Sequence, residues 1–458
     1  MRIVILGAGP TGLGAAHRLH ELGHTDFTVV DRNPYFGGLA TSFRDDHGFT
    51  WDFAVHVAHS HYHYVDALMD RLLPDGFYHH QRKSWVRLLG TYAPYPFQNN
   101  VRHLPGPALW DCVEGLLALQ AAAPAGKPAN FEEWIRAGFG AGIARHFMLP
   151  YNRKIWSTEP RDMGYQWIGD RVPTIDFKRI LRNIALGIDD VGWGPNATFQ
   201  FPKEGGTGAI WQKLGESLPP ERVRLSLAVA SIDPARREIR YADGSRDRYD
   251  HLISTLPIPV LVKLAGLEPA LGPAVRRLRH THVQVAGIAA AQKIPDALAD
   301  KTWLYVPGDE SIFYRVTPFS TFSPAHTPDP EKHCSFLCEI STPGDGPMHP
   351  GDLKDRVLRD LREGGLIDCD PATTRHFPMA AEYGYPVPTL DRDDVLAEIL
   401  PQLDALGISS RGRFGGWKYE VANMDHSLMQ GVECANRLLL DEPEITLFQP
   451  SVVNAGKR

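Results

Sequence analysis

The sequence predicts an α/β fold that combines a Rossmann-like domain, a helical domain and a domain built on a mixed β-sheet. Three observations predict it. Residues 2–6 and 27–30 are short apolar runs on either side of a helical pattern at 13–22, which makes a βαβ unit within about 30 residues. The middle of the chain is mostly helical in pattern and rich in aromatic residues. From residue 223 onward strand patterns dominate.

The remaining elements follow in order along the chain. Expected helices of the middle region cover 64–73, 108–121 and 131–148, with two more between 165 and 186. Expected strands then cover 223–232, 238–241, 246–249 and 252–257, with Asp243-Gly244 as a turn signal. A second sheet is expected from 280–292, 302–306, 311–317 and 334–341. Helices at 352–363, at 392–406 and from about His426 to Leu439 complete the chain, with a loop at 386–388.

Composition and charge exclude several classes of function. Of the 458 residues 43% are apolar and 22% charged, and the formal net charge is −6. No block of Lys and Arg stands out, so we expect no nucleic-acid partner. No run approaches ~18 apolar residues, so no membrane span is expected. The first apolar run stops at Gly7, too early for a signal peptide, and the five Cys are scattered, so we expect reduced thiols and a cytoplasmic protein.

A dinucleotide-binding turn follows the first strand. Gly7, Gly9 and Gly12 have the GxGxxG spacing, open a helix, and are followed by Asp31 at the end of the second strand. The first glycine permits the tight turn, the second lets the backbone approach a pyrophosphate, and the third allows close packing of helix on strand. The acid can accept hydrogen bonds from ribose hydroxyls.

Two further segments make FAD the expected dinucleotide. Gly37-Gly38-Leu39-Ala40 comes shortly after the acid and suits backbone contact along the flavin diphosphate and ribityl chain. The segment Asn423–Ser427 precedes or opens the last helix, whose positive end would point at the pyrimidine edge of the flavin and stabilise negative charge there.

Long sequence blocks beyond these motifs resemble the UDP-galactopyranose mutases, in particular the longer form found in fungi and other eukaryotes. The resemblance extends over nearly the whole chain. Its blocks are Gly37-Gly38-Leu39-Ala40, Ser60-His61-Tyr62, Tyr95-Pro96-Phe97-Gln98-Asn99-Asn100, Phe147-Met148-Leu149-Pro150-Tyr151-Asn152, Gly194-Pro195-Asn196-Ala197-Thr198-Phe199, Gly205-Gly206-Thr207-Gly208-Ala209-Ile210-Trp211, Arg411-Gly412-Arg413-Phe414-Gly415-Gly416-Trp417-Lys418-Tyr419-Glu420 and Asp425-His426-Ser427.

The resemblance implies an isomerase (an intramolecular transferase) that interconverts the pyranose and furanose forms of a nucleotide-diphosphate hexose, as in the formation of galactofuranose. In such mutases N5 of reduced FAD attacks the anomeric carbon, and the sugar opens and recloses with the other ring size. The reaction is redox-neutral, but FAD must first be reduced, and NADPH or NADH is the expected reductant. The expected domains are a discontinuous FAD-binding Rossmann-like domain of residues 1–90, 200–270 and 405–458, a helical domain of 100–195 that covers the substrate, and a mixed-sheet substrate domain of 271–404.

The resemblance also implies the site residues. Two arginines clamp the substrate diphosphate, and a histidine lies beside the reactive face of the flavin, so the expected catalytic residues are His56, Arg171 and Arg315. The expected cofactor-binding residues are Gly7, Gly9, Thr11, Gly12, Asp31, Arg32, Gly38, Leu39, Val229, Arg413, Asn423, Met424 and Ser427. The expected substrate-binding residues are Tyr95, Gln98, Phe147, Asn152, Trp156, Arg171, Asn196, Trp303, Tyr305, Arg315, Tyr385 and Tyr419.

A run of alternating histidines raises the question of a metal. His59, His61 and His63 would share one face of a strand, but no carboxylate at ligand spacing completes a set. We therefore favour a hydrogen-bonded, His-rich loop over a metal site and expect no metal.

Two departures from the family pattern concern the flavin and the substrate. The family has two glycines directly before the histidine where this chain has Ala54-Val55, and it has Asn-Gln where this chain has Asn423-Met424. These changes leave the fold prediction intact but widen the substrate prediction to UDP-galactopyranose or a related sugar such as a GDP-hexose. Two alternatives stay open: an FAD-dependent oxidoreductase of the amine-oxidase type, and a flavin-binding relative without mutase activity. The oligomeric state, a homo-oligomer included, also stays open.

Overall fold

The computed structural model describes the chain except residues 75, 123–125, 170–171, 174, 193 and 195–196. Its N-terminal unit is β1 (Ile3–Leu6), α1 (Pro10–Glu21) and β2 (Phe27–Val30). Together with β9 (Val223–Arg224), β13 (His251–Ser254) and β19 (Ile408–Ser410), the strands form a five-stranded parallel sheet in the order β19-β13-β1-β2-β9. The predicted βαβ opening and the Rossmann-like domain are confirmed.

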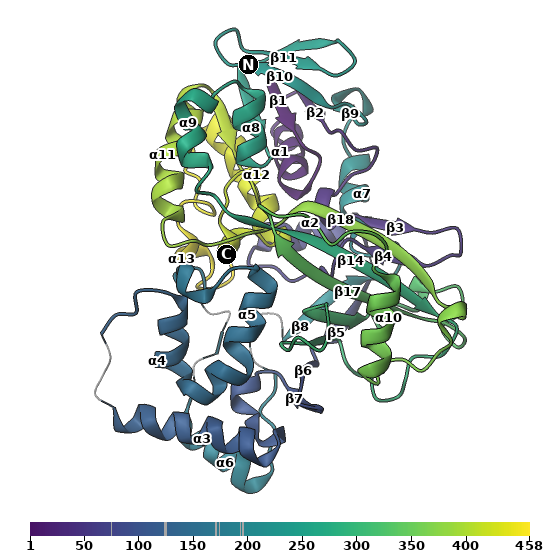
Figure 1. Cartoon of the computed structure of the whole chain (residues 1–458). Coiled ribbons are helices and arrows are strands. Elements are labelled where there is room, and N and C mark those ends of the chain that lie inside the picture. Colours follow the sequence, from purple (N-terminus) through teal and green to yellow (C-terminus); the bar gives the residue numbers. More distant parts are fainter. Residues whose placement is uncertain (75, 123–125, 170–171, 174, 193, 195–196) are drawn as a thin grey trace.

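Helices cover both faces of this sheet (Figure 1). On one face Ile3 and Ile5 pack in one core with α1, α7 (Gly208–Glu216) and α12 (Met424–Leu440). On the other face Val4 and Leu6 pack in a second core with α8 (Ile258–Leu264), α9 (Glu268–Val275) and α11 (Arg392–Ala405). The alternation of side chains along β1 therefore explains why this strand is an unbroken apolar run, as parallel strands with two covered faces are.

The long strand predicted at 223–232 is two strands. β9 ends at Arg224, and β10 (Val229–Asp233) begins a separate antiparallel sheet with β11 (Glu238–Tyr241) and β12 (Arg246–Arg248). Between them Ser226 has a φ of 57°, and the backbone N–H of Leu227 donates to Asp31 O at 2.8 Å. The chain thus turns across the end of β2, which places Val229 at the predicted cofactor site.

A seven-stranded mixed sheet forms the second large layer. Its order is β18 (Arg375–Pro386), β14 (His280–Ala290), β17 (Cys334–Pro343), β16 (Arg315–Pro318), β15 (Trp303–Tyr305), β6 (Ser84–Leu88) and β7 (Thr91–Pro94). Its pairs are antiparallel except for β15 with β6, and α10 (Lys354–Glu363) packs in the core on one face. Because β6 and β7 belong to this sheet, the segment 84–90 lies outside the parallel-sheet unit to which the prediction assigned it. Conversely, α11 packs on the parallel sheet, although the prediction placed it in the mixed-sheet domain of residues 271–404.

The helices of the middle region lie together at the lower left of Figure 1. They are α3 (Gly106–Ala121), α4 (Phe131–Ile143), α5 (Leu149–Trp156) and α6 (Phe177–Leu186), and α2 (His63–Leu72) packs on the parallel-sheet side. The range 131–148 is helical as predicted but not one regular helix, because Gly140 interrupts α4 with a φ of 76° and residues Ala144–Met148 form a π-helix. Between 165 and 186 the described residues contain one α-helix, not two.

Short elements complete the fold: β3 (Ser42–Arg44), β4 (Thr50–Asp52), β5 (Phe77–Gln81), β8 (Thr198–Pro202) and α13 (Pro450–Val453).

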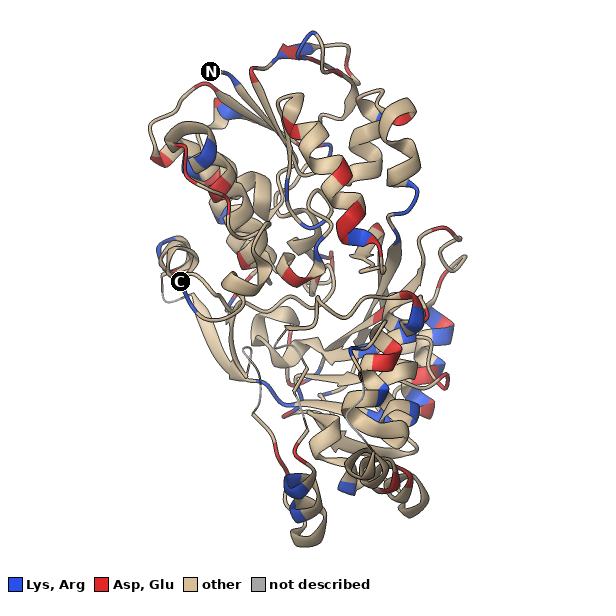
Figure 2. Cartoon of the chain, turned by 90° about the vertical axis from the view of Figure 1, so that its left-hand side faces the viewer, with Lys and Arg blue, Asp and Glu red and all other residues tan. Residues whose placement is uncertain are grey.

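Basic and acidic residues lie mixed along the outer helices (Figure 2). Among the described residues, no helix combines the length and the apolar character that a membrane crossing requires.

Candidate active site

A cavity of about 1480 Å³ lies between the two large sheets. On one side it is bordered by the carboxyl ends of the parallel strands: Gly7 after β1, Asp31 after β2, Thr255 after β13 and Gly412 after β19. On the other side, residues of β15, β16 and β18 line it. Crevices at the carboxyl ends of parallel strands are where open α/β sheets bind their ligands.

Each of the three glycines in the predicted dinucleotide turn has a different geometric role. Gly7 has a φ of 108°, and a Cβ there would lie 2.0 Å from Thr255 Oγ1. A Cβ on Gly12 would lie 1.9 Å from Gly7 O, so this glycine lets α1 pack against the turn, but it does not line the cavity. A Cβ on Gly9 would meet no protein atom closer than 3.8 Å, and Gly9 lines the cavity. The space beside Gly9 is therefore a cradle that a bulky side chain would fill, which fits a bound pyrophosphate.

Asp31 holds the turn in place. Its Oδ2 accepts a hydrogen bond from the N–H of Ala8 at 2.7 Å, and its Oδ1 accepts one from the N–H of Asn33 at 2.8 Å. Each carboxylate oxygen keeps a further lone pair for a ligand hydroxyl. The other predicted cofactor residues on this side also line the cavity: Thr11, Arg32, Gly38, Leu39 and Val229.

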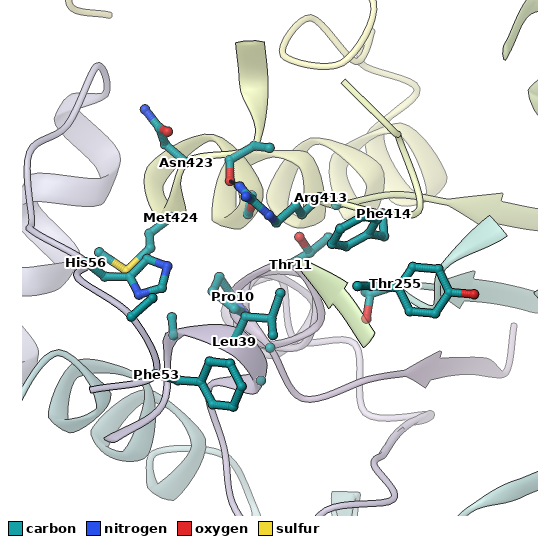
Figure 3. Close-up of a pocket in the computed structure, with 18 of the residues that line it drawn as sticks. Pro10, Thr11, Leu39, Phe53, His56, Thr255, Arg413, Phe414, Asn423 and Met424 are labelled. Carbon is teal, nitrogen blue, oxygen red and sulfur yellow. Dashed lines mark hydrogen bonds between the residues drawn. The ribbon is translucent and has the colours of Figure 1, made fainter. Parts of the chain in front are cut away.

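The start of α12 borders the cavity beside α1. Asn423, Met424 and Ser427 line the cavity, and Figure 3 shows Asn423 above Met424, with Arg413 and Thr11 of α1 to their right. The guanidinium of Arg413 donates to Gly384 O at 2.9 and 3.1 Å, so it joins β18 to the approach to α12. Two helix N-termini thus face one cavity, which favours a ligand with negative charge at both places.

His56 lies at the cavity next to Met424 (Figure 3). Burial, together with the nearby Arg413 and Arg315, lowers the pKa of His56 to about 4, so its imidazole is neutral at pH 7. Its Nδ1 has no hydrogen-bond partner in the protein, and its backbone oxygen accepts from Thr207 Oγ1 at 2.6 Å. Ala54, two residues earlier, has a φ of 67°, the left-handed conformation that glycine adopts most easily.

Six predicted substrate residues line the other end of the cavity: Tyr95, Trp303, Tyr305, Arg315, Tyr385 and Tyr419. Arg315 is held by the buried Glu339, to which its Nε donates at 2.8 Å and its Nη2 at 2.6 Å. A guanidinium has five N–H donors, so three remain for an anion. The rings of Tyr95 and Tyr305 contact each other with centroids 5.5 Å apart, which gives this end an aromatic wall with hydroxyl groups.

Four predicted substrate residues lie outside the cavity lining. Gln98 is buried and its amide donates to Pro173 O at 3.0 Å, and Asn152 donates to Met148 O one turn earlier in the helix. Phe147 and Trp156 pack in the core of the helical region, where the ring of Trp156 lies edge-on to Tyr419 at 4.8 Å. They therefore support the lining rather than form it in this structure. Arg171 and Asn196 fall outside the residues that the structure describes.

Several lining residues were not predicted from the sequence. Arg82 lies over the ring of Tyr95 at 5.4 Å and borders the cavity. Residues 454–457 also line it, and Arg458 pairs through its backbone with His61 and His63. No local motif marks these residues, because the fold brings them to the site from distant parts of the chain.

A histidine–aspartate cluster lies at the start of α12. His61 donates from its backbone N–H to Asp425 Oδ2 at 2.9 Å, and its Nδ1 lies 2.8 Å from the same oxygen. Burial alone would raise the pKa of Asp425, but His426 and His61 hold it well below its usual value. Ligand atoms of His61, Asp425 and His426 all lie within 4.8 Å of one another, so this is the place among the described residues where a metal ion would find three ligands.

Comparison with known proteins places the chain among flavoproteins. Residues 10–377 match the family of flavin containing amine oxidoreductases. The structure is similar to that of reduced UDP-galactopyranose mutase, with a TM-score of 0.95, 39% sequence identity, and coverage of 100% of this chain and 98% of that chain. It is also similar to a presumed protoporphyrinogen oxidase from Exiguobacterium sp. 255-15 (TM-score 0.73, 18% identity, 96% of this chain and 99% of that chain). A CLA-producing fatty acid isomerase from P. acnes is a further match (TM-score 0.62, 17% identity, 96% and 98%). The last two likenesses show a shared fold, and the first extends over the length of both chains.

Proposed function

The chain belongs to the UDP-galactopyranose mutase family of flavin-containing proteins, and on that premise we propose that it interconverts the pyranose and furanose forms of a nucleotide-diphosphate hexose with the help of reduced FAD. One observation carries the proposal beyond the family. A single cavity joins the glycine turn at Gly9 to Arg315 and its neighbouring tyrosines. A dinucleotide and an anionic sugar nucleotide would therefore meet in one enclosed space, as a reaction between them requires.

The cavity residues have separate tasks in this proposal. When bound in its reduced form, FAD supplies the nucleophilic nitrogen for the anomeric carbon. Gly9, Asp31 and the start of α1 hold its diphosphate and ribose. Arg315 binds the diphosphate of the substrate through the N–H groups that Glu339 leaves unused. On the resemblance, Arg171 is the second arginine of this clamp and Asn196 is a polar contact to the base or the sugar, but both lie outside the described residues.

His56 and the tyrosines complete the site. The neutral imidazole of His56 can take up a proton at its unpartnered Nδ1. Tyr385 and Tyr419 border the cavity between Arg315 and the aromatic core of the helical region, where their rings exclude water and their hydroxyls can donate to phosphate or sugar oxygens. NADPH or NADH is the proposed reductant, and UDP-galactopyranose the first substrate to examine, followed by GDP-hexoses.

The experiment uses the holoprotein under anaerobic conditions. Protein reduced with a substoichiometric amount of dithionite, or with NADPH or NADH, is incubated with UDP-galactopyranose or a GDP-hexose, and the nucleotide sugars are separated by chromatography. We expect many turnovers to a furanose isomer of the same mass, and none with oxidised protein. Consumption of one reductant per product, or oxygen uptake coupled to product, would instead favour an oxidoreductase of the amine-oxidase type.

A further inference from the structure

Glu339 is a buried carboxylate that does not line the cavity but contacts groups at both of its ends. It lies on β17 with no exposed surface. It accepts four hydrogen bonds: two from Arg315, one from Tyr314 Oη at 2.7 Å and one from the N–H of Val55 at 3.3 Å. These donors come from the start of β16, with Tyr314 just before it, and from the loop that carries His56, which are more than 250 residues apart in the sequence.

On the substrate side Glu339 sets the direction of Arg315. The guanidinium is planar, so two hydrogen bonds to one carboxylate fix its orientation as well as its position. The side chain of Arg315 is 18% exposed, and its remaining N–H groups are the part that reaches the cavity. Tyr314 Oη also lies 3.2 Å from the hydroxyl of Tyr385, which lines the cavity. Glu339 thus holds one lining residue directly and a second one through Tyr314.

On the flavin side Glu339 holds the loop Phe53–Val57. All five residues of this loop line the cavity, and the N–H of Val55 is tied to Glu339 Oε1. The same oxygen accepts from Arg315 Nε, so the two donors share one acceptor. Any movement of Arg315 toward an anion therefore changes the hydrogen bonding and the position of the carboxylate oxygen that holds the loop.

We propose that Glu339 is a positioning residue that couples anion binding at Arg315 to the arrangement of the loop Phe53–Val57 against the flavin. This inference rests on the proposed function, because it takes the anion to be a nucleotide diphosphate and the cofactor to be FAD. Oxidised and reduced FAD differ in charge, and the loop with His56 borders the cavity where FAD is proposed to bind. Coupling between two sites is reciprocal, so the affinity for a diphosphate must then depend on the flavin redox state.

The test compares the dissociation constant of UDP for oxidised and for dithionite-reduced holoprotein, measured by anaerobic calorimetry. The variants are E339Q, which keeps the shape but removes the charge, and E339D, which keeps the charge but shortens the reach. The matched control is D360N, because Asp360 is also a buried carboxylate that pairs with an arginine, Arg356, but does not line or contact the cavity residues discussed here. Flavin content and the circular dichroism spectrum check folding.

The readout is the ratio of the two dissociation constants and not the affinity itself. Removing the carboxylate strengthens the attraction of Arg315 for any anion but loosens its orientation, and these effects oppose each other. We expect at least about a fivefold ratio in the wild type and in D360N, the lower end for coupled sites, and less than about twofold in E339Q. E339D should lie between them.

Two results would overturn the inference while leaving the proposed function intact: a ratio in E339Q equal to that of the wild type, or a wild-type ratio of one with measurable UDP binding in both states. If E339Q does not retain FAD, E339D takes its place in the test. The inference then requires that the ratio of the two dissociation constants is smaller in E339D than in the wild type. A wild type that binds neither UDP nor GDP in either state would overturn the proposed function, and this inference with it; a wild type that binds only GDP is tested with GDP in the same way.

Discussion

At Ala54 the backbone adopts the left-handed conformation although the residue carries a Cβ. Its φ is 67°, and it lies two residues before His56 in the cavity loop. A left-handed conformation costs an L-residue roughly 1–2 kcal/mol relative to glycine. A residue with a Cβ thus occupies a backbone conformation that glycine adopts most easily. The loop is therefore strained, and Glu339 and Thr207 hold it in place.

Replacing Ala54 by glycine should leave the free energy of unfolding unchanged or raise it by up to about 1 kcal/mol, because the relief of strain offsets the entropy that glycine gains in the unfolded chain. Ala58 in the same segment is buried and has no positive φ, so Ala58→Gly is the matched control and should cost about 1 kcal/mol. Chemical denaturation of both variants measures the difference. Equal destabilisation by the two substitutions would show that Ala54 is not strained.

The low pKa of His56 has a consequence for stability against pH. The folded protein protonates His56 only near pH 4, whereas the unfolded chain does so near 6.5. Between these values the unfolded state binds more protons, so this histidine makes the free energy of unfolding fall as the pH falls from about 6.5 to 4.

The difference in the free energy of unfolding between the wild type and His56→Gln should therefore be constant above pH 7. Below pH 6.5 it should change with pH, with a slope that corresponds to the binding of at most one proton. Denaturation curves at half-unit steps of pH measure this slope. A difference that stays constant from pH 7 to 4, with both proteins folded, would mean that His56 has an ordinary pKa.

Residues of the site differ in how readily the sequence revealed them. The glycine turn and Asp31 were predicted because a local spacing has a steric reason that holds in any such fold. Arg315 and the tyrosines were indicated only by family resemblance, since nothing local distinguishes them from core or surface residues. Glu339 and Arg82 were not predicted, because no local pattern marks them: Glu339 meets Arg315 only through the pairing of β17 with β16, and Arg82 meets Tyr95 only once the chain is folded.

At the scale of elements, the two helices at the cavity are held together by glycines. A Cβ on Gly14 of α1 would lie 2.4 Å from Leu428 O, and one on Gly431 of α12 would lie 2.0 Å from Thr11 O. The helix axes therefore approach more closely than side chains would allow, and both N-termini reach the same cavity. The position of the two helix dipoles at the site follows from these two glycines.

Gly431→Ala should destabilise the protein by about 1–3 kcal/mol, the range for overpacking, and should also weaken FAD retention because α12 must shift away from α1. The control is Gly138→Ala in α4, where a Cβ meets no atom within 4 Å and where alanine should add up to about 1 kcal/mol of helix stability. Denaturation and the ratio of flavin to protein absorbance measure both effects. A Gly431→Ala protein with wild-type stability and full flavin content would show that the close contact is not needed.

The elements that the sequence failed to predict share a physical reason. β18 is the edge strand of its sheet and contains Pro378, and nine of its twelve residues are exposed or partly exposed, so it lacks the apolar run of a central strand. β6 is short and pairs with β15, more than 200 residues later in the chain. Helices such as α3 and α11 were predicted to within two residues, because their pattern is local.

At the scale of the whole molecule, the cavity lies between two sheets that belong to different layers. The parallel sheet contributes the glycine turn, and the seven-stranded sheet contributes Arg315 and Tyr385. Each ligand should therefore depend mainly on one layer, although both occupy one space. Substitutions in the two layers can separate the two binding events, which makes the proposed function testable without turnover.

Gly9→Val should lose the stabilisation of the protein by FAD, whereas Arg315→Lys should keep it and lose much of the stabilisation by UDP. In Gly9→Val the added Cβ would lie no closer than 3.8 Å to protein, and the side chain would occupy the cavity beside it, so the chain should fold but retain no FAD, and added FAD should not raise its Tm. In Arg315→Lys the charge beside Glu339 is kept but the planar fork is lost, so FAD should remain while UDP affinity falls by about 1.5–3 kcal/mol, roughly 10- to 150-fold.

Thermal unfolding of each protein with and without FAD and UDP measures the pattern, since a ligand at 100 times its Kd adds about 2.7 kcal/mol of stability. Lysine is preferred to alanine at position 315, because alanine would leave the buried Glu339 without its ion pair and would itself cost several kcal/mol. The control is Gly12→Ala, whose Cβ would lie 1.9 Å from Gly7 O: it should lower the stability of the apoprotein, which Gly9→Val should not. If Gly9→Val retains FAD, the pyrophosphate does not lie at this turn. If Arg315→Lys binds UDP as tightly as the wild type does, the diphosphate lies elsewhere in the cavity, and the assignment of one ligand mainly to each sheet is wrong.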